Sequence, residues 1–266
     1  MSMNKNVCYT CIVGNYDTLK DPAVISENFD YICYTDNPKI KSNIWEIKPI
    51  DDIINKYSNN IMNRFIKWLP YIFLSDYEFS IYVDGSIKVL NDLNEFKNKY
   101  CNDPDILMYL IPHNKRNYIY EEFLANAYGR KEEVPILYNQ MKKYLNENLP
   151  DNYLLTHNCM LFRYHNKHEY IDIGNNLWKE MSRTTFRDQL SLPYIIWKLD
   201  LKDKIKLINP GVLNKYFDYN NSWNHDMKYD QEKNLLNDVI KYLKNNNYNQ
   251  ADEFIELINK MFKSYM

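Results

Sequence analysis

The sequence predicts a protein of the α/β class with a mostly parallel mixed sheet flanked by helices. Short apolar runs typical of strands alternate with segments whose apolar residues recur at helical spacing. Polar turn residues follow most of the strand-like runs directly. No internal repeat and no Pro- or Ser-rich linker divides the 266 residues. We therefore expect one domain over residues 1–210, with a helical C-terminal extension over residues 211–266 packed on it.

The expected strands are apolar runs, and in the first half of the chain each ends in a polar turn. These runs cover residues 7–13, 29–35, 79–83 and 106–111. In the second half we expect short strands over 154–156 and 160–162, separated by the polar pair His157 and Asn158, and a last strand over 205–208.

The expected helices carry apolar residues three and four positions apart. The first covers residues 59–69 and ends before Pro70. Further helices are expected over 132–149, 169–181, 185–197, 231–243 and 250–262. Thr185 and Asp188 have the spacing of a capping box, in which both side chains satisfy free amides at the start of a helix.

The composition excludes several classes of protein. Thirty-three Lys and Arg against 35 Asp and Glu give a net charge of −2, which argues against a general nucleic-acid binder. The Gly-rich phosphate-binding patterns GxGxxG and GxxxxGK(S/T) are absent. No apolar run is long enough to predict a transmembrane span, and the segment MSMNKNVCYTCIVG lacks the apolar stretch of a secretory signal peptide.

Cys8 and Cys11 form a CxxC motif, which zinc sites and thiol redox sites also use. The motif lies within an apolar run and no second such pair follows, so we expect buried, reduced cysteines. We therefore expect a cytoplasmic protein, and peripheral contact with the inner face of a membrane stays open.

Ligands of open α/β sheets bind beyond the carboxyl ends of the strands, and polar residues stand at four such ends here. They are residues 10–17, residues 35–37, residues 84–86, and His113 with Arg116. Asp84 is a candidate ligand for a hard divalent cation that would neutralise phosphates. In the alternative interpretation, Asp84 and Gly85 form an ordinary turn that the glycine permits.

Charged residues near these strand ends each have a structural alternative. Arg64 and Lys67 lie three apart on a helix, where they would bind phosphate or form a solvated face. His113 and Arg116 would bind sugar hydroxyls or phosphate, or pair with Glu121 or Glu122.

The second half of the chain adds further candidates. Asp188 and Gln189 open a helix, so Asp188 is either a helix cap or a catalytic carboxylate. His157 and Asn158 would complete a pocket wall. His225 would be a ligand or a surface residue, and His165 with His168 makes only a weak zinc pattern.

With these residues in view, the chain resembles the glycosyltransferase-like family that includes the plant mucilage hexosyltransferase and a plant protein described as an alkaline ceramidase. The matching segments keep the family's order over about residues 7–200. They are GNYDTLKDP (14–22), DYICYTDNP (30–38), NRFIKWLP (63–70), SIYVDGSIKV (80–89), IPHNKRNYIYEEF (111–123), HNCMLFRYH (157–165) and FRDQLSLPYIIWKL (186–199).

The resemblance implies a GT-A-like fold whose Asp-x-Asp position reads Asp84-Gly85-Ser86 here, with a hydroxyl in place of the second carboxylate. It implies Asp84 as ligand of Mn²⁺ or Mg²⁺ or of the donor, and His225 as a loose match to a late metal-binding His. By the same analogy, Thr10, Tyr16 and Asp36 would hold the nucleoside. Arg64 and Lys67 would face the diphosphate, and Asp188 and Gln189 would lie near the donor sugar.

We therefore expect a hexosyltransferase-type glycosyltransferase that uses a nucleotide-diphosphate sugar, with a UDP-sugar as the expected donor. The expected acceptor is a glycan or a lipid-linked glycan. Two alternatives remain open. One is a non-catalytic nucleotide- or glycan-binding module, and the other is a lipid-amide hydrolase, for which the sequence offers no GxSxG nucleophile motif.

Overall fold

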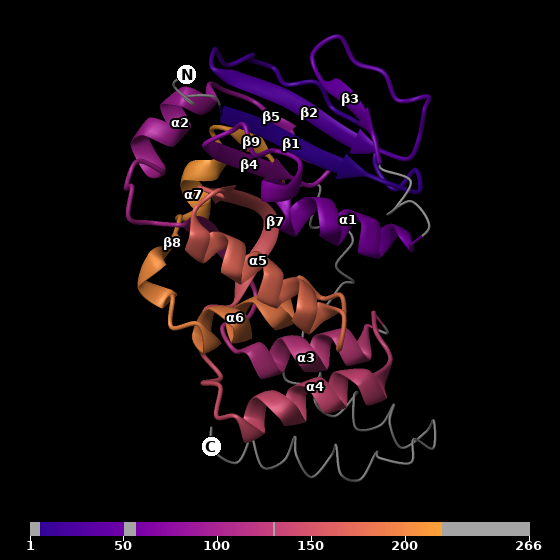
Figure 1. Ribbon diagram of the computed structural model, residues 1–266, viewed down its shortest axis with the longest axis vertical. Helices are drawn as coiled ribbons and strands as arrows, with labels where there is room; N and C mark the ends of the chain where they lie inside the picture. Colours follow the sequence, from indigo (N-terminus) through magenta and orange to yellow (C-terminus); the bar gives the residue numbers. More distant parts are fainter. Residues whose placement is uncertain (1–5, 51–56, 130, 220–266) are drawn as a thin grey trace.

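The computed structural model describes residues 6–50, 57–129 and 131–219, and its centre is one mixed sheet (Figure 1). The seven strands of the sheet have the order β3-β2-β1-β4-β7-β6-β8. They are β1 (Asn6–Ile12), β2 (Phe29–Thr35), β3 (Glu46–Pro49), β4 (Phe79–Val83), β6 (Met108–Pro112), β7 (Thr156–Arg163) and β8 (Ile205–Leu207). The two pairings of β7 are antiparallel and the other pairings are parallel. The predicted α/β class with a mostly parallel mixed sheet is confirmed.

Helices and a small second sheet cover the two faces. The helices are α1 (Asn59–Trp68), α2 (Leu93–Tyr100), α3 (Ile119–Tyr128), α4 (Val134–Asn146), α5 (His168–Met181), α6 (Asp188–Lys198) and α7 (Pro210–Leu213). Short 3-10 turns lie at Pro70–Ile72 and Lys202–Lys204, and β5 (Lys88–Val89) pairs with β9 (Phe217–Asp218).

Alternating side chains of β1 enter two separate cores, as expected for a strand buried on both faces. Val7, Tyr9 and Cys11 pack in the core that also contains apolar residues of α1, α3, α4, α5 and α6. Cys8 and Ile12 point into the core formed with α2, α7 and the small sheet. This layering leaves the carboxyl ends of β1 and β4 beside α1 (Figure 1).

The predicted break at His157 and Asn158 is wrong, because one continuous strand, β7, spans it. Main-chain pairing with β6 continues past the polar pair, through His157 with Ile111, after a shift of register between Tyr109 and Ile111. A strand that is held by a neighbour over this stretch tolerates polar side chains where they face a cavity. The break that the sequence predicts is therefore a pocket-facing part of a strand.

The predicted capping box is also wrong. Helix α6 begins at Asp188, its N-cap is Arg187, and no side chain caps it. The Thr185 hydroxyl instead donates to Gln140 Oε1 at 2.9 Å. The Asp188 carboxylate contacts α1, as described below, so neither residue has the predicted capping role.

All five cysteines are buried and unpaired, which confirms the structural interpretation of Cys8 and Cys11. Burial raises the pKa of both thiols well above the usual range, so neither is a ready thiolate. Within the described ranges, no three or more His, Cys, Asp or Glu side chains gather as a metal-binding group, and no helix is long and apolar enough to cross a bilayer.

The predicted helices over 231–243 and 250–262 and the candidate His225 lie outside the described residues. The division of the chain near residue 210 therefore stays a prediction.

Candidate active site

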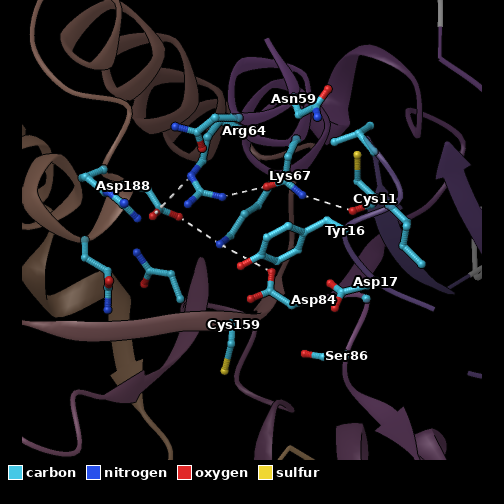
Figure 2. Close-up of a pocket in the computed structure, with 18 of the residues that line it drawn as sticks. Cys11, Tyr16, Asp17, Asn59, Arg64, Lys67, Asp84, Ser86, Cys159 and Asp188 are labelled. Carbon is cyan, nitrogen blue, oxygen red and sulfur yellow. Dashed lines mark hydrogen bonds and ion pairs between the residues drawn. The ribbon is translucent and has the colours of Figure 1, made fainter. Parts of the chain in front are cut away.

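A cavity of about 620 Å³ lies beyond the carboxyl ends of β1 and β4 (Figure 2). Nine of the predicted site residues line it: Tyr16, Arg64, Lys67, Asp84, Ser86, His157, Asn158, Asp188 and Gln189. They come from the loop after β1, helix α1, the turn after β4, the start of β7 and the start of α6. The expected convergence of strand ends on one crevice therefore holds for two parallel strands, and β7 and α6 complete the wall.

Helix α1 carries the basic residues Arg64 and Lys67, and its residue Asn63 anchors the helix to the sheet. The Asn63 amide donates to Cys11 O at 3.1 Å and to the Tyr82 hydroxyl at 3.2 Å. The carbonyl oxygen of the same side chain accepts from Arg64 Nη1 at 2.7 Å. One residue thus ties α1 to β1 and β4 and orients the guanidinium beside it.

Lys67 is a buried cation between two carboxylates. Its side chain is 3% exposed, and Nζ lies 2.9 Å from Asp188 Oδ2 and 3.9 Å from Asp84 Oδ1 (Figure 2). The ammonium also stands over the Tyr82 ring, 5.2 Å from its centroid. The alternative of a solvated basic face is therefore wrong for this residue.

Asp188 is buried and doubly ion-paired. Besides Lys67, its carboxylate accepts from Trp68 Nε1 at 2.9 Å and lies 3.5 Å from Arg64 Nε. Burial alone would raise the pKa of Asp188, but the charges of Arg64 and Lys67 outweigh it and hold the pKa well below the usual range. The carboxylate is thus ionised, and its low pKa makes it a weak proton acceptor.

Asp84 ends β4 at the mouth of the cavity, with its side chain 36% exposed. Its amide donates to Cys159 O at 2.9 Å, and its carbonyl accepts from Ile87 N at 2.9 Å, which closes the turn. Gly85 is needed for space: a Cβ there would come within 2.8 Å of Asp17 Cβ. The φ of Gly85 lies outside the left-handed region, so space and not an unusual backbone angle explains the glycine here.

The loop after β1 is shaped by Asp36. Both carboxylate oxygens of Asp36 accept from Gly14 N at 3.0 Å, where Gly14 has a φ of 64°. Tyr16, two residues later, is 72% exposed and lines the cavity. Asp36 and the buried Thr10 do not line it, so the structure does not bring these two predicted residues to the cavity.

Two amide side chains in the wall are oriented by Thr156. Its hydroxyl donates to Asn158 Oδ1 at 2.8 Å, and its carbonyl accepts from Gln189 Nε2 at 3.2 Å. This leaves Asn158 Nδ2 as a buried donor without a partner in the described part of the chain. The bond to Thr156 O uses Gln189 Nε2, so the carbonyl oxygen of Gln189 remains as an acceptor for a hydroxyl group.

His113 and Arg116 form a separate cluster around Glu122. Arg116 Nε donates to Glu122 Oε2 at 2.6 Å, and His113 Nε2 lies 3.7 Å from the same oxygen. Neither residue lines the cavity, so the ion-pair alternative describes them. The His113 ring does lie 6.0 Å from that of His157, whose Nδ1 is 2.9 Å from Cys159 Sγ.

Sequence reasoning missed several lining residues, which include Asn59, Asn60, Lys131, Cys159 and Arg187, whereas Cys11 and Asp17 fall within the predicted range 10–17. Asn59, Asn63 and Lys67 recur four apart, and that spacing places them on one helical face. The spacing was therefore a usable signal for α1. Lys131 carried no such signal, because it lies in a connection between α3 and α4.

A divalent cation would find one or two carboxylates here. Asp84 faces the cavity, and Asp17 packs against Gly85 next to it (Figure 2). Mg²⁺ is commonly held by one or two carboxylates together with substrate phosphates. Asp84 and Asp17 fit that mode, in which the phosphates of a bound nucleotide supply the other ligands.

Comparison with known proteins was made by sequence and by structure. The family model described as "TOD1/MUCI70, glycosyltransferase-like domain" matches residues 32–214. No curated protein sequence matches the chain. Among solved structures, the apo structure of the bifunctional glycosyltransferase WbbM is similar with 12% identity and a TM-score of 0.45. The similarity covers 77% of this chain and 39% of the WbbM chain.

Proposed function

The chain belongs to the TOD1/MUCI70 family of glycosyltransferase-like domains, and on that premise we propose that it transfers a sugar from a nucleotide-diphosphate sugar. A UDP-sugar is the donor we propose, and a glycan or lipid-linked glycan is the acceptor. The observation that carries the proposal is the buried Lys67 ammonium, which lines the cavity next to Asp84. A preorganised cation that is itself buried suits a diphosphate leaving group.

The diphosphate is proposed to bind at Lys67 and Arg64. Asp188 and Asp84 together balance these two charges. Among the described residues, the four basic side chains that line the cavity nevertheless outnumber its three carboxylates, which leaves one positive charge; the basic ones are Arg64, Lys67, Lys131 and Arg187, and the acidic ones are Asp17, Asp84 and Asp188. As the bond between sugar and phosphate breaks, negative charge builds up on the departing diphosphate. Lys67 and Arg64 would stabilise that charge where it develops.

Asp188 is proposed to hold the two cations in place. Because the pKa of Asp188 lies well below the usual range, it is a poor general base. Its burial and its two ion pairs favour orientation of Lys67 and Arg64 instead.

The remaining parts of the donor fit the two ends of the cavity. Tyr16 presents an exposed ring for a nucleoside base, on the loop that Asp36 holds in shape. Gln189, whose amide nitrogen donates to Thr156 O, offers its carbonyl oxygen as an acceptor for a sugar hydroxyl. A GT-A-like arrangement of base, diphosphate and sugar along the strand ends is therefore our proposal.

Asp84 and Asp17 are proposed as the residues that would hold a divalent cation, Mg²⁺ or Mn²⁺. When bound, such an ion would supply two positive charges that stabilise the leaving diphosphate. His225 cannot be placed in this arrangement, because it lies outside the described residues.

A thermal-shift panel tests the proposal. UDP, GDP and their sugar nucleotides are added with and without Mn²⁺ at about 100 times the dissociation constant, where binding adds about 2.7 kcal/mol to the stability of the fold. Stabilisation by a sugar nucleotide together with release of free UDP supports a transferase. Stabilisation with no turnover would favour the non-catalytic binding module, which the replacement of an acidic residue by Ser86 also favours.

The cytoplasm remains the proposed location. The five buried, unpaired cysteines are compatible with a reducing compartment.

A further inference from the structure

Arg163 is a fully buried cation that the proposed reaction does not use. The side chain extends from β7 and is 0% exposed. Among the described residues, no carboxylate forms an ion pair with it. A buried charge without a counterion is strongly unfavourable unless other groups compensate for it. The compensation must therefore come from its neutral neighbours.

Those neighbours are aromatic. Arg163 Nη1 donates to the Tyr170 hydroxyl at 2.9 Å, and Nη2 donates to the Tyr9 hydroxyl. The guanidinium lies between 5.5 and 5.9 Å from the ring centroids of Tyr9, Trp68 and Tyr170. Ring faces attract a cation, and the two hydroxyl oxygens accept its protons.

The same two hydroxyls donate hydrogen bonds to main-chain carbonyls at the end of α1. The Tyr9 hydroxyl donates to Lys67 O at 3.0 Å, with Ile66 O at 3.3 Å. The Tyr170 hydroxyl donates to Trp68 O at 3.1 Å. Because Arg163 donates to both oxygens, each hydroxyl proton is free to point at a carbonyl. Hydrogen bonds in such a chain strengthen one another.

The sequence explains why these carbonyls need donors. The carbonyl of Ile66 would normally accept from the amide four residues later, but that residue is Pro70, which has no N–H. The last carbonyls of a helix also carry partial negative charge. Arg163 thus places a positive charge at the negative end of α1 and satisfies its buried carbonyls through two tyrosines.

The same helical turn carries the residues that contact Asp188. Lys67 Nζ and Trp68 Nε1 both lie 2.9 Å from Asp188 Oδ2. We propose that Arg163, through the hydroxyls of Tyr9 and Tyr170, is a positioning residue that fixes this turn and so sets where the Lys67 ammonium meets the diphosphate. The inference rests on the proposed function, because it takes Lys67 as a diphosphate ligand.

Helix α5 is shaped for this contact. A Cβ at Gly174 would lie 3.1 Å from Trp68 O and 2.8 Å from Tyr71 Cε1, so the glycine allows α5 to approach the end of α1 closely. Tyr170, one turn earlier on α5, thereby reaches Trp68 O.

The test uses Tyr9→Phe and Tyr170→Phe, which remove one hydroxyl each and keep the ring. Tyr120→Phe is the matched control. The buried hydroxyl of Tyr120 also donates to a carbonyl, Leu149 O, at 3.1 Å, but Tyr120 lies on α3 and does not contact the end of α1 through this bond. Calorimetric titration with UDP is run on the full chain, at a temperature where melting curves show every variant folded.

We expect about a tenfold loss of UDP affinity in Tyr9→Phe and in Tyr170→Phe, because a small displacement of a charged ligand group is costly. Tyr120→Phe is expected to lower the melting temperature to a similar extent and to keep UDP affinity within twofold. Arg163→Lys keeps the charge and is expected to bind UDP better than Arg163→Met. Melting temperatures that fall in the two tyrosine variants while UDP affinity stays at the wild-type value would overturn the inference.

Failure of the proposed function gives a different result. If the wild-type chain binds no nucleoside diphosphate, that function fails, and a crystal structure of Tyr170→Phe then decides the inference. A Lys67 ammonium displaced from Asp188 supports the positioning role, whereas an unchanged ion pair overturns it.

Discussion

Two buried carboxylates, Asp188 and Glu122, have nearly the same surroundings but different positions. Each is 3% exposed and contacts two basic side chains, Arg64 and Lys67 for Asp188, Arg116 and His113 for Glu122. Only the Asp188 cluster lines the cavity. The two clusters differ in the further contacts that their members make.

Lys67 also reaches Asp84 at the cavity mouth, whereas Glu122 accepts a further hydrogen bond at 2.9 Å from Asn126 on its own helix. The Glu122 cluster is therefore satisfied internally. The Asp188 cluster keeps a cation at a surface that a ligand can reach. A basic residue near a strand end thus indicates a binding site only where it lines a cavity whose basic side chains outnumber its carboxylates, as they do here.

The largest expected effect is that of Lys67→Met. Removing this ammonium leaves Asp188 with one fewer counterion and removes the proposed diphosphate contact. We expect UDP affinity to fall at least about 100-fold, which lies within the loss of about 2–5 kcal/mol expected when one partner of a buried charge pair is removed. Calorimetric titration measures the affinity, and a melting curve verifies that the variant is folded. Wild-type affinity in a folded variant would contradict the role of Lys67.

Asp188→Asn is the next largest change, and it separates an ion-paired carboxylate from a helix cap. Asn caps a helix about as well as Asp, so a capping role predicts little change. The buried ion pairs predict a loss of about 3 kcal/mol of stability at pH 7, because two cations lose their counterion. Urea unfolding of both proteins measures the difference.

The pH dependence of that difference follows from the pKa of Asp188. The folded-state pKa lies below the unfolded value of about 3.9, so the stabilisation is complete above that pH. It is lost as the pH falls through the folded-state value. We therefore expect the stability gap between wild type and Asp188→Asn to narrow only below about pH 4. A gap that is constant down to pH 2 would argue against the ion pairs.

Tyr16→Ala is expected to lower UDP affinity moderately, through loss of the contact with the nucleoside base only. The exposed ring is the proposed base contact, and loss of a stacked aromatic weakens base binding by about tenfold. Because the ring is 72% exposed, the melting temperature of the free protein should not change. Equal affinities of wild type and variant for UDP would remove Tyr16 from the site.

Arg116→Met is the matched change in the Glu122 cluster and has the smallest expected effect on binding. It removes a cation 2.6 Å from a buried carboxylate, as Lys67→Met does at 2.9 Å. We expect UDP affinity to stay within twofold while the melting temperature falls. An affinity loss comparable to that of Lys67→Met would mean that the two clusters act as one site.

The sequence predicts most of the sheet because local signals are strong there. Strands β2 and β4 coincide with the predicted ranges, since both are apolar runs that a polar turn ends. Strand β3 escaped notice because Glu46–Pro49 is a partly exposed edge strand with little apolar character. Strand β7 is predicted as two short strands because polar residues interrupt its apolar pattern, and its continuity depends on the pairing with β6.

Site residues could be predicted where their position in the chain was enough to place them at the cavity. They could not be predicted where the outcome depended on which counterion each charged side chain has in the fold. Asp84, Lys67 and Asp188 stand at element ends or on one helical face, so sequence reasoning found them. The same reasoning also selected His113 and Arg116, because nothing in the sequence says that Glu122 satisfies both. The support of α1 by Arg163 joins residues about a hundred positions apart, and only the fold brings them together.

The most direct test of the central claim compares UDP with uridine as ligands of the wild-type protein. If the buried Lys67 makes this cavity a diphosphate site, calorimetric titration should give UDP an affinity at least about 100-fold higher than that of uridine, because the diphosphate adds charge-assisted contacts. Affinities for UDP and uridine that agree within twofold would mean that the phosphates make no favourable contact. They would contradict the account.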